Sequence, residues 1–228
     1  NGDDPTFGDV VFTDNDLPDF DQVTTGSWSQ TWIYSFGGGV CAIDSIATVE
    51  DSWFVDNSAD QGGGAYAGSS TTMAVSGSWF DDNAASDGAA VASADSSVSL
   101  SGSILACNVA TTDGGGLYTE SSGTNSAYNS VLYGNTAGTA STNGSQIYVG
   151  SGSTTAVTYS ISWGNTSSPL FYAGGTGTVS DTDLYNSGAG GTTGGSWTVG
   201  TGVTNSGTFA GSISCDGNPW NDTGTLPM

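Results

Sequence analysis

Short apolar runs alternate with Gly-, Ser-, Thr- and Asn-rich stretches along most of this chain. Runs of this length, bounded by turn-forming residues, predict many short β-strands joined by tight turns. The 228 residues include seven Trp, nine Tyr and eight Phe, which favours a folded chain because disordered segments are poor in aromatic residues. The length suits one large domain or two small ones.

The first repeated motif is a large apolar residue followed, three positions later, by asparagine. Its clearer copies end at Asn15, Asn57, Asn83, Asn108 and Asn135, and a weaker copy ends at Asn165. From Asn57 onward, successive asparagines recur at nearly regular intervals, and the last interval is the longest.

The second motif is a glycine-rich step before a small or branched apolar residue. Its copies are Gly37-Gly-Gly-Val40, Gly62-Gly-Gly-Ala65, Gly88-Ala-Ala-Val91 and Gly114-Gly-Gly-Leu117, and their spacing is almost constant. Two motifs that keep a constant phase indicate an internal repeat of about 25–26 residues.

A repeat of this length is too short for a βαβ unit, which needs about 30 residues. It suits one coil of a parallel β-helix, in which equivalent positions stack in columns ~4.8 Å apart. We therefore predict an all-β fold, a right-handed parallel β-helix with irregular caps. Its expected apolar column is Phe54, Phe80, Leu105 and Leu132, and its expected hydrogen-bonding column is Asn57, Asn83, Asn108, Asn135 and Asn165.

The two motifs resemble the paired F-x-x-N and G-G-A-[ILV] repeats of the polymorphic outer membrane proteins, which are bacterial autotransporter adhesins. The resemblance covers roughly residues 37–172, with an outlying copy at 10–15. It implies a β-helix that is secreted or exposed on a cell surface, where it serves in adhesion or as a stalk.

The repeats also suggest how the chain is organised. We expect an N-terminal segment or cap with one outlying repeat at 1–36, a β-helix core at 37–172, and degenerate coils with a C-terminal cap at 173–228. Caps are expected because an open solenoid end exposes apolar surface and unpaired strand edges.

The chain contains no Lys, Arg or His and carries a formal charge of −22. Nucleic acid is disfavoured as a partner, because its binding depends on cations that neutralise phosphates. Insertion into a membrane is not expected, because no apolar run approaches about 18 residues.

The same absence argues against an enzyme, since no imidazole or amine is present to act as a base. A glycosidase needs only two carboxylates in one cleft. The adjacent pair Asp81 and Asp82 does not meet this need, because neighbouring strand residues point to opposite faces. We predict a non-enzymatic protein.

Two acidic groups are candidate calcium sites. Asp14, Asp16, Asp19 and Asp21 lie within eight residues, and Asp56 and Asp82 should stack one coil apart. Calcium prefers six to eight oxygen ligands, which clustered carboxylates supply. The alternative is a plain acidic loop without a metal, so the cofactor prediction is either none or calcium.

Three cysteines are present, Cys41, Cys107 and Cys215, so at least one has no partner within the chain. They are either small buried core residues or include one disulfide that involves Cys215, for which Cys107 is the candidate partner.

Two functions remain open. The first is a subunit of an extracellular filament, sheath or stalk that assembles head to tail with copies of itself. It is motivated by the unlike charge of the two ends, since 12 of the 22 carboxylates lie in residues 1–60 and none in 121–180. The second is a monomeric surface adhesin that binds cell-surface glycans, with Trp28, Trp32 and Tyr34 as candidates for stacking on sugar rings.

Overall fold

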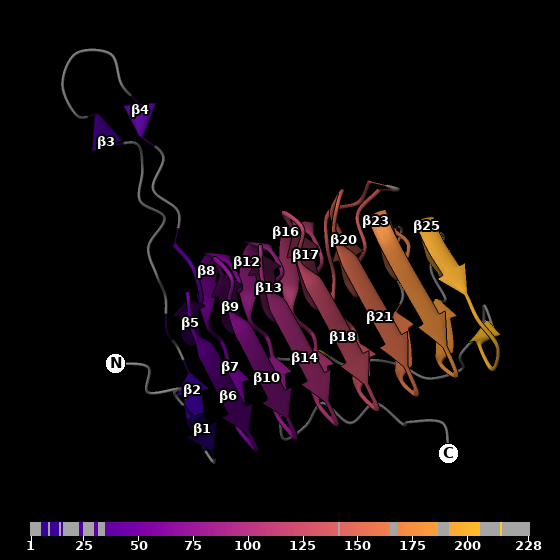
Figure 1. Ribbon diagram of the computed structural model, residues 1–228, viewed down its shortest axis with the longest axis horizontal. Helices are drawn as coiled ribbons and strands as arrows, with labels where there is room; N and C mark the ends of the chain where they lie inside the picture. Colours follow the sequence, from indigo (N-terminus) through magenta and orange to yellow (C-terminus); the bar gives the residue numbers. More distant parts are fainter. Residues whose placement is uncertain are drawn as a thin grey trace.

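The computed structural model describes residues 6–8, 10–13, 15, 23–24, 30–31, 35–140, 142–164, 168–186, 192–205 and 215. These residues form strands and turns and contain no helix. Figure 1 shows the strands stacked in parallel rows, with successive coils following the long axis of the molecule. The predicted parallel β-helix is thereby confirmed, with about six turns.

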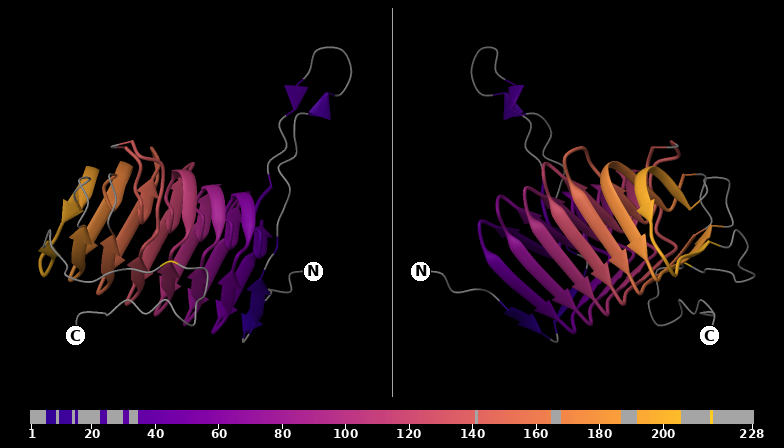
Figure 2. Two further views of the ribbon diagram at one scale, coloured as in Figure 1. Left: turned by 180° about the vertical axis from the view of Figure 1, so that it is seen from behind. Right: turned by 45° about the vertical axis from the view of Figure 1, so that its right-hand side comes forward.

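One coil illustrates the repeat. Four short strands follow one another around it, namely β9 (Ala65–Gly68), β10 (Thr72–Ser76), β11 (Trp79–Asp81) and β12 (Ala84–Asp87). Each pairs in parallel with its equivalents in the preceding and following coils. Figure 2 shows that this winding continues in one direction from the N-terminal to the C-terminal coil.

The largest sheet has thirteen strands in two runs that meet at β23 (Phe171–Ser180). The first run contains β1 (Thr6–Gly8), β6 (Ile46–Glu50), β10, β14 (Ser97–Ser101), β18 (Thr124–Tyr128) and β21 (Thr154–Thr158). The second contains β5 (Val40–Ile43), β9, β13 (Val91–Ala94), β17 (Leu117–Glu120) and β20 (Ile147–Val149). Beyond β23 lies β25 (Thr193–Val199).

Two further parallel sheets complete the coils. The eight-stranded sheet contains β2 (Val11–Thr13), β7 (Trp53–Val55), β11, β15 (Ile104–Ala106), β19 (Val131–Tyr133), β22 (Ile161–Gly164), β24 (Asp183–Asn186) and β26 (Thr204–Asn205). The three-stranded sheet contains β8 (Ser58–Gln61), β12 and β16 (Val109–Asp113). A separate antiparallel pair joins β3 (Val23–Thr24) and β4 (Gln30–Thr31).

The stacked strands extend to both sides of residues 37–172. On the N-terminal side, β1 and β2 pair with β6 and β7. On the C-terminal side, β24, β25 and β26 continue the stack to residue 205. The outlying repeat at 10–15 is therefore part of a coil.

The apolar column runs through the centre of the coils. Phe12, Phe54 and Phe80 occupy equivalent register positions, and their rings stack with centroids 4.7 and 4.4 Å apart. Leu105 and Leu132 continue the column, and both are fully buried, as are Phe54 and Phe80. Burial of each of these side chains contributes about 1.5–3 kcal/mol of hydrophobic free energy.

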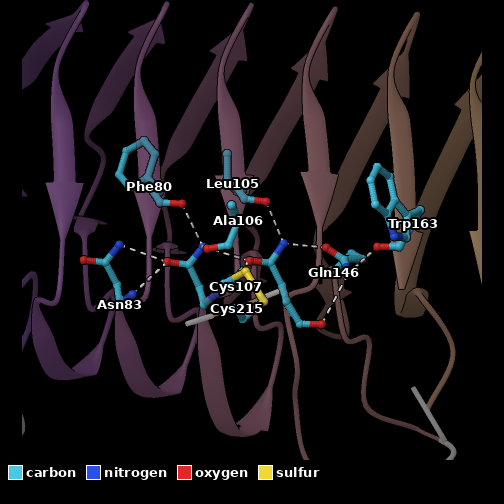
Figure 3. The surroundings of a disulfide bond; sticks show 10 residues. Phe80, Asn83, Leu105, Ala106, Cys107, Gln146, Trp163 and Cys215 are labelled. Atoms are coloured by element: carbon cyan, nitrogen blue, oxygen red, sulfur yellow. Dashed lines mark hydrogen bonds between the residues drawn. A yellow bond between two sulfur atoms is a disulfide. The ribbon is translucent and has the colours of Figure 1, made fainter. Parts of the chain in front are cut away.

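The asparagine column forms a continuous hydrogen-bonded ladder, part of which is drawn in Figure 3. In each step the backbone N–H and the side-chain amide of one asparagine donate to the Oδ1 atom of the next. For Asn83 and Asn108 the two distances are 3.0 and 2.9 Å. Asn57, Asn83, Asn108 and Asn135 are all completely buried, so the ladder satisfies polar groups that water does not reach.

The two ends of the ladder differ. At the N-terminal end, the amide of Asn15 donates to Oδ1 of Asn57 at 2.6 Å. At the other end, Asn135 donates to Oε1 of Gln146, whose own amide donates to the carbonyl of Trp163 at 3.2 Å. Asn165, the predicted last member, lies outside the described residues.

Cys107 and Cys215 form a disulfide, shown in Figure 3. Cys107 directly precedes Asn108 of the ladder, so the bond attaches residue 215 to the middle of the β-helix across a separation of 108 residues. Constraining a loop of this length stabilises the folded state by up to about 4–5 kcal/mol in the chain-entropy model. Cys41, in β5, is exposed and forms no disulfide.

We predict that Asn108→Ala lowers the free energy of unfolding by about 3–5 kcal/mol, because several buried polar groups then lose their partners. These groups are the N–H and amide of Asn83 and the carbonyl of Phe80. Thermal and urea unfolding would measure the loss. Ser99→Ala, which removes an exposed hydroxyl, is the control and should change stability by less than about 0.5 kcal/mol. Equal effects of the two substitutions would contradict a stabilising role for the ladder.

Candidate functional site

The predicted calcium ligands fall in two places. Asp14, Asp16, Asp19 and Asp21 lie outside the described residues, as do the aromatic residues Trp28, Trp32 and Tyr34. Asp56 and Asp82 occupy equivalent left-handed turn positions, with φ of 56° and 51°, directly before ladder asparagines. Within the described ranges, no three His, Cys, Asp or Glu residues are grouped so that they could hold a metal ion.

A pocket of about 310 Å³ lies elsewhere, on the outer side of the second run of the large sheet. Its lining residues are Phe36, Gln61, Tyr66 and Glu120. Gln61 ends β8, Tyr66 lies in β9, and Glu120 ends β17, so the pocket joins residues from coils that are distant in sequence.

The glycine-rich steps place one column of polar residues at this surface. Gln61, Asp87 and Asp113 each directly precede the first glycine of a step, and they occupy equivalent positions in β8, β12 and β16. The turn that follows Gln61 requires glycine, because Gly62 has φ of 66° and an added Cβ would lie 2.3 Å from the carbonyl oxygen of Ala65.

The space for the pocket comes from small residues in the intervening coil. Ala92 pairs with Tyr66 of the preceding coil and with Tyr118 of the following coil. Ala94 lies two residues further along the same strand and pairs with Glu120 of the following coil. Because these alanines extend little from β13, the side chain of Glu120 crosses above them to reach Gln61, 59 residues away in sequence.

Glu120 is held by two neutral donors. The hydroxyl of Tyr118 donates to Oε2 at 2.9 Å, and the amide of Gln61 donates to Oε1 at 3.3 Å. The rings of the other two lining residues, Phe36 and Tyr66, are in contact, with centroids 4.4 Å apart. The pocket therefore combines aromatic faces with a fixed carboxylate and an amide.

Two further carboxylates lie close to this surface. Burial, followed by repulsion from Asp87, raises the pKa of Asp113 from 3.8 to about 6. Burial is also the main cause that raises the pKa of Asp87, and repulsion from Glu120 acts in the same direction. The backbone N–H of Asp113 donates to Oδ1 of Asp87 at 3.3 Å and relieves only part of this cost.

The same carboxylates keep the nearby phenols neutral. Burial raises the pKa of Tyr66, Tyr118 and Tyr148, and the negative charge of Glu120 adds to the effect at each of them. These phenols therefore stay protonated further into the alkaline range than an ordinary tyrosine. Tyr118 and Tyr148 stack with centroids 5.3 Å apart.

None of the pocket residues was a candidate on sequence grounds. One signal was present, because Gln61, Asp87 and Asp113 recur directly before the glycine steps at the coil period. The pairing of Gln61 with Glu120 had no such signal, since the two residues belong to different columns and are two coils apart.

Comparisons with protein-family models, with curated proteins and with solved structures return no match to this chain. Within the part of the chain that the structure describes, no helix is long and apolar enough to span a bilayer. The function is therefore argued from the site itself.

We predict that Asp113→Asn stabilises the protein above about pH 6 and has no such effect below about pH 4. The folded-state pKa of Asp113 lies above its ordinary value of 3.8, so the folded state binds the proton more tightly and loses stability as pH rises through this window. Because the side chain is partly exposed, we expect a gain of about 1 kcal/mol after solvent screening, or about 2–4 °C in Tm.

Melting curves of both proteins across this pH range would measure the gain. The exposed Glu50 offers a control, since Glu50→Gln removes the same charge far from Asp87. A gain at Asp113 that is independent of pH would contradict the assignment.

Proposed function

We propose that this chain is a non-enzymatic, extracellular carbohydrate-binding module, with its ligand held in the pocket that Phe36, Gln61, Tyr66 and Glu120 line. The observation that carries the proposal is the pocket itself, which is lined by two aromatic rings, a hydrogen-bonded carboxylate and an amide. Small-molecule sites typically combine apolar walls with a few oriented polar groups in this way.

The lining suits a sugar ring. A pyranose presents apolar C–H faces, which pack on the rings of Phe36 and Tyr66, and peripheral hydroxyl groups, which pair with the oxygen atoms of Glu120 and the amide of Gln61. A phosphorylated, sulfated or nucleic-acid ligand is disfavoured, because the whole chain offers no cationic side chain to neutralise it.

Two observations support an extracellular location. The Cys107–Cys215 disulfide is typical of proteins that fold in an oxidising compartment. The resemblance of the two repeated motifs to those of the polymorphic outer membrane proteins implies exposure at a cell surface and adhesion, which agrees with glycan binding.

The absence of catalysis is part of the proposal. Glycoside hydrolysis requires two carboxyl groups that flank the same glycosidic bond. Of the four residues that line the pocket, one, Glu120, carries a carboxylate. The chain also has no Lys or His to serve as an alternative base.

We predict that a glycan array identifies selective ligands and that Tyr66→Ala weakens their binding about tenfold or more, equivalent to about 1.4 kcal/mol. Tyr66→Phe keeps the ring and should retain most of the affinity. Tyr128→Ala is the matched control, because Tyr128 is an exposed tyrosine on the other run of the sheet. Titration calorimetry of the three variants would measure the changes. Selective binding that Tyr66→Ala leaves intact would disprove the role of the pocket.

A second candidate function is a subunit of a head-to-tail filament. Among the described strands, β1 pairs with β6 alone and β25 with β23 alone, so the two ends of the stack present strand edges. Such edges are templates for pairing with another chain, and a head-to-tail contact that does not close on itself produces fibres.

If the edges do assemble, Val199→Glu should shorten or abolish fibres seen by electron microscopy, because a charge on an edge strand opposes pairing. Val199 lies at the end of β25 and is 51% exposed. Tyr128→Glu places the same charge in the middle of the stack and should leave fibres intact. Imaging with calcium and with chelator would also show whether the contact depends on the metal. Dispersed particles of about 23 kDa under all conditions would disprove the filament.

A further inference from the structure

The carboxylate of the pocket has no positively charged partner. Glu120 receives hydrogen bonds from Tyr118 and Gln61, both of which are neutral. The chain contains no Lys, Arg or His, so no side chain anywhere in it can neutralise this charge. These donors leave the negative charge of the carboxylate uncompensated, so a cationic group on a ligand would add an ion-pair attraction that they do not supply.

The surroundings strengthen the negative potential at the pocket. Asp87 and Asp113 continue the column that begins with Gln61, one and two coils further along the stack. Burial and then repulsion from Asp87 raise the pKa of Asp113, and burial with added repulsion from Glu120 raises that of Asp87, so negative charges are concentrated at this surface. A positive charge placed there would lower the energy of all three carboxylates, whereas a neutral sugar would not.

The aromatic wall favours the same ligand charge. Phe36 and Tyr66, whose rings are in contact with each other, line the same pocket as Glu120. A cation near the face of an aromatic ring is attracted by the ring quadrupole, and the attraction increases as water is removed. A ligand ammonium group at this position therefore interacts with a carboxylate and with aromatic faces at once.

We propose that the ligand of this pocket is an amino sugar in its protonated form, with its ammonium group at the carboxylate of Glu120 and its ring against Tyr66. The inference rests on the proposed carbohydrate-binding function and narrows it to one charge class. It distinguishes glucosamine from N-acetylglucosamine and glucose, which are otherwise similar. Of the three, only glucosamine carries a positive charge, on its free amine.

The experiment is a calorimetric titration with β-linked glucosamine oligomers, their N-acetylated counterparts and glucose oligomers of equal length. It is done at about pH 5.5, below the pKa of a sugar amine, which the neighbouring oxygens hold below that of an α-amino group, and at near-physiological salt, which screens long-range attraction. We expect the amine form to bind about tenfold or more tightly than either neutral form. In Glu120→Gln this preference should disappear, while weak binding of all three sugars remains.

The control separates the pocket from the general acidity of the chain. Glu50→Gln removes one negative charge from an exposed position on β6 and should keep the full preference for the amine. Equal losses in Glu120→Gln and Glu50→Gln would overturn the inference, because attraction would then be a property of the whole surface.

The remaining outcomes distinguish the two proposals. Binding of N-acetylated or glucose oligomers as tight as that of the amine form would overturn the cationic ligand and leave the carbohydrate-binding function standing. Failure of all three oligomers to bind, together with an empty glycan array, would overturn both.

Discussion

The buried amide ladder is the interaction on which the rest of the structure depends. Directly before each ladder asparagine from 57 to 135 the chain turns through a left-handed residue, and the turn leaves backbone N–H and carbonyl groups inside the β-helix, where water does not reach. The asparagines at 57, 83, 108 and 135 satisfy those groups with neutral donors and acceptors. This solution requires no ion pair, which suits a chain that has no cationic side chain.

A second ladder works in the same way at another corner of the coil. The backbone N–H groups of Ser52, Ser78, Ser103 and Ser130 each donate to a serine hydroxyl one coil further along. Together, the two ladders fix the register between coils at two corners, while the phenylalanine stack fills the space between them. Side-chain hydrogen bonds along the stack thus specify the alignment, and apolar burial supplies the driving force for folding.

The fold could be predicted from the sequence because residues that contact one another in neighbouring coils recur at a nearly fixed interval along the chain. Phe54 contacts Phe80 since both occupy the same place in the repeat, and that recurrence is visible without coordinates. The ladder departs from the period after Asn135, where the interval to the next motif asparagine is the longest of those from Asn57 onward, and there Gln146 accepts the hydrogen bond from Asn135. That replacement has no sequence signal, because it depends on how the inserted residues return to the stack.

The pocket was not predictable, because it does not follow the period of the repeat. Its central hydrogen bond joins Gln61 and Glu120, which occupy different columns, and its volume depends on Ala92 and Ala94 being small. The sequence period shows only the features that the coils share, whereas a binding site arises where one coil differs from its neighbours. Four consecutive coils, which supply Phe36, Gln61, Ala92 and Glu120 in turn, must each contribute a different residue type before the hollow exists.

This dependence on four particular coils constrains how the protein can change its length during evolution. Whole-repeat duplications preserve both ladders wherever they occur, so the β-helix can lengthen or shorten in steps of one coil. Between residues 61 and 120, however, such a step would move Glu120 by about one strand spacing, near 4.8 Å, relative to Gln61 and break their hydrogen bond. Phe36, which contacts Tyr66, extends this interval, so descendants of this chain that retain the pocket should vary in coil number only outside residues 36–120.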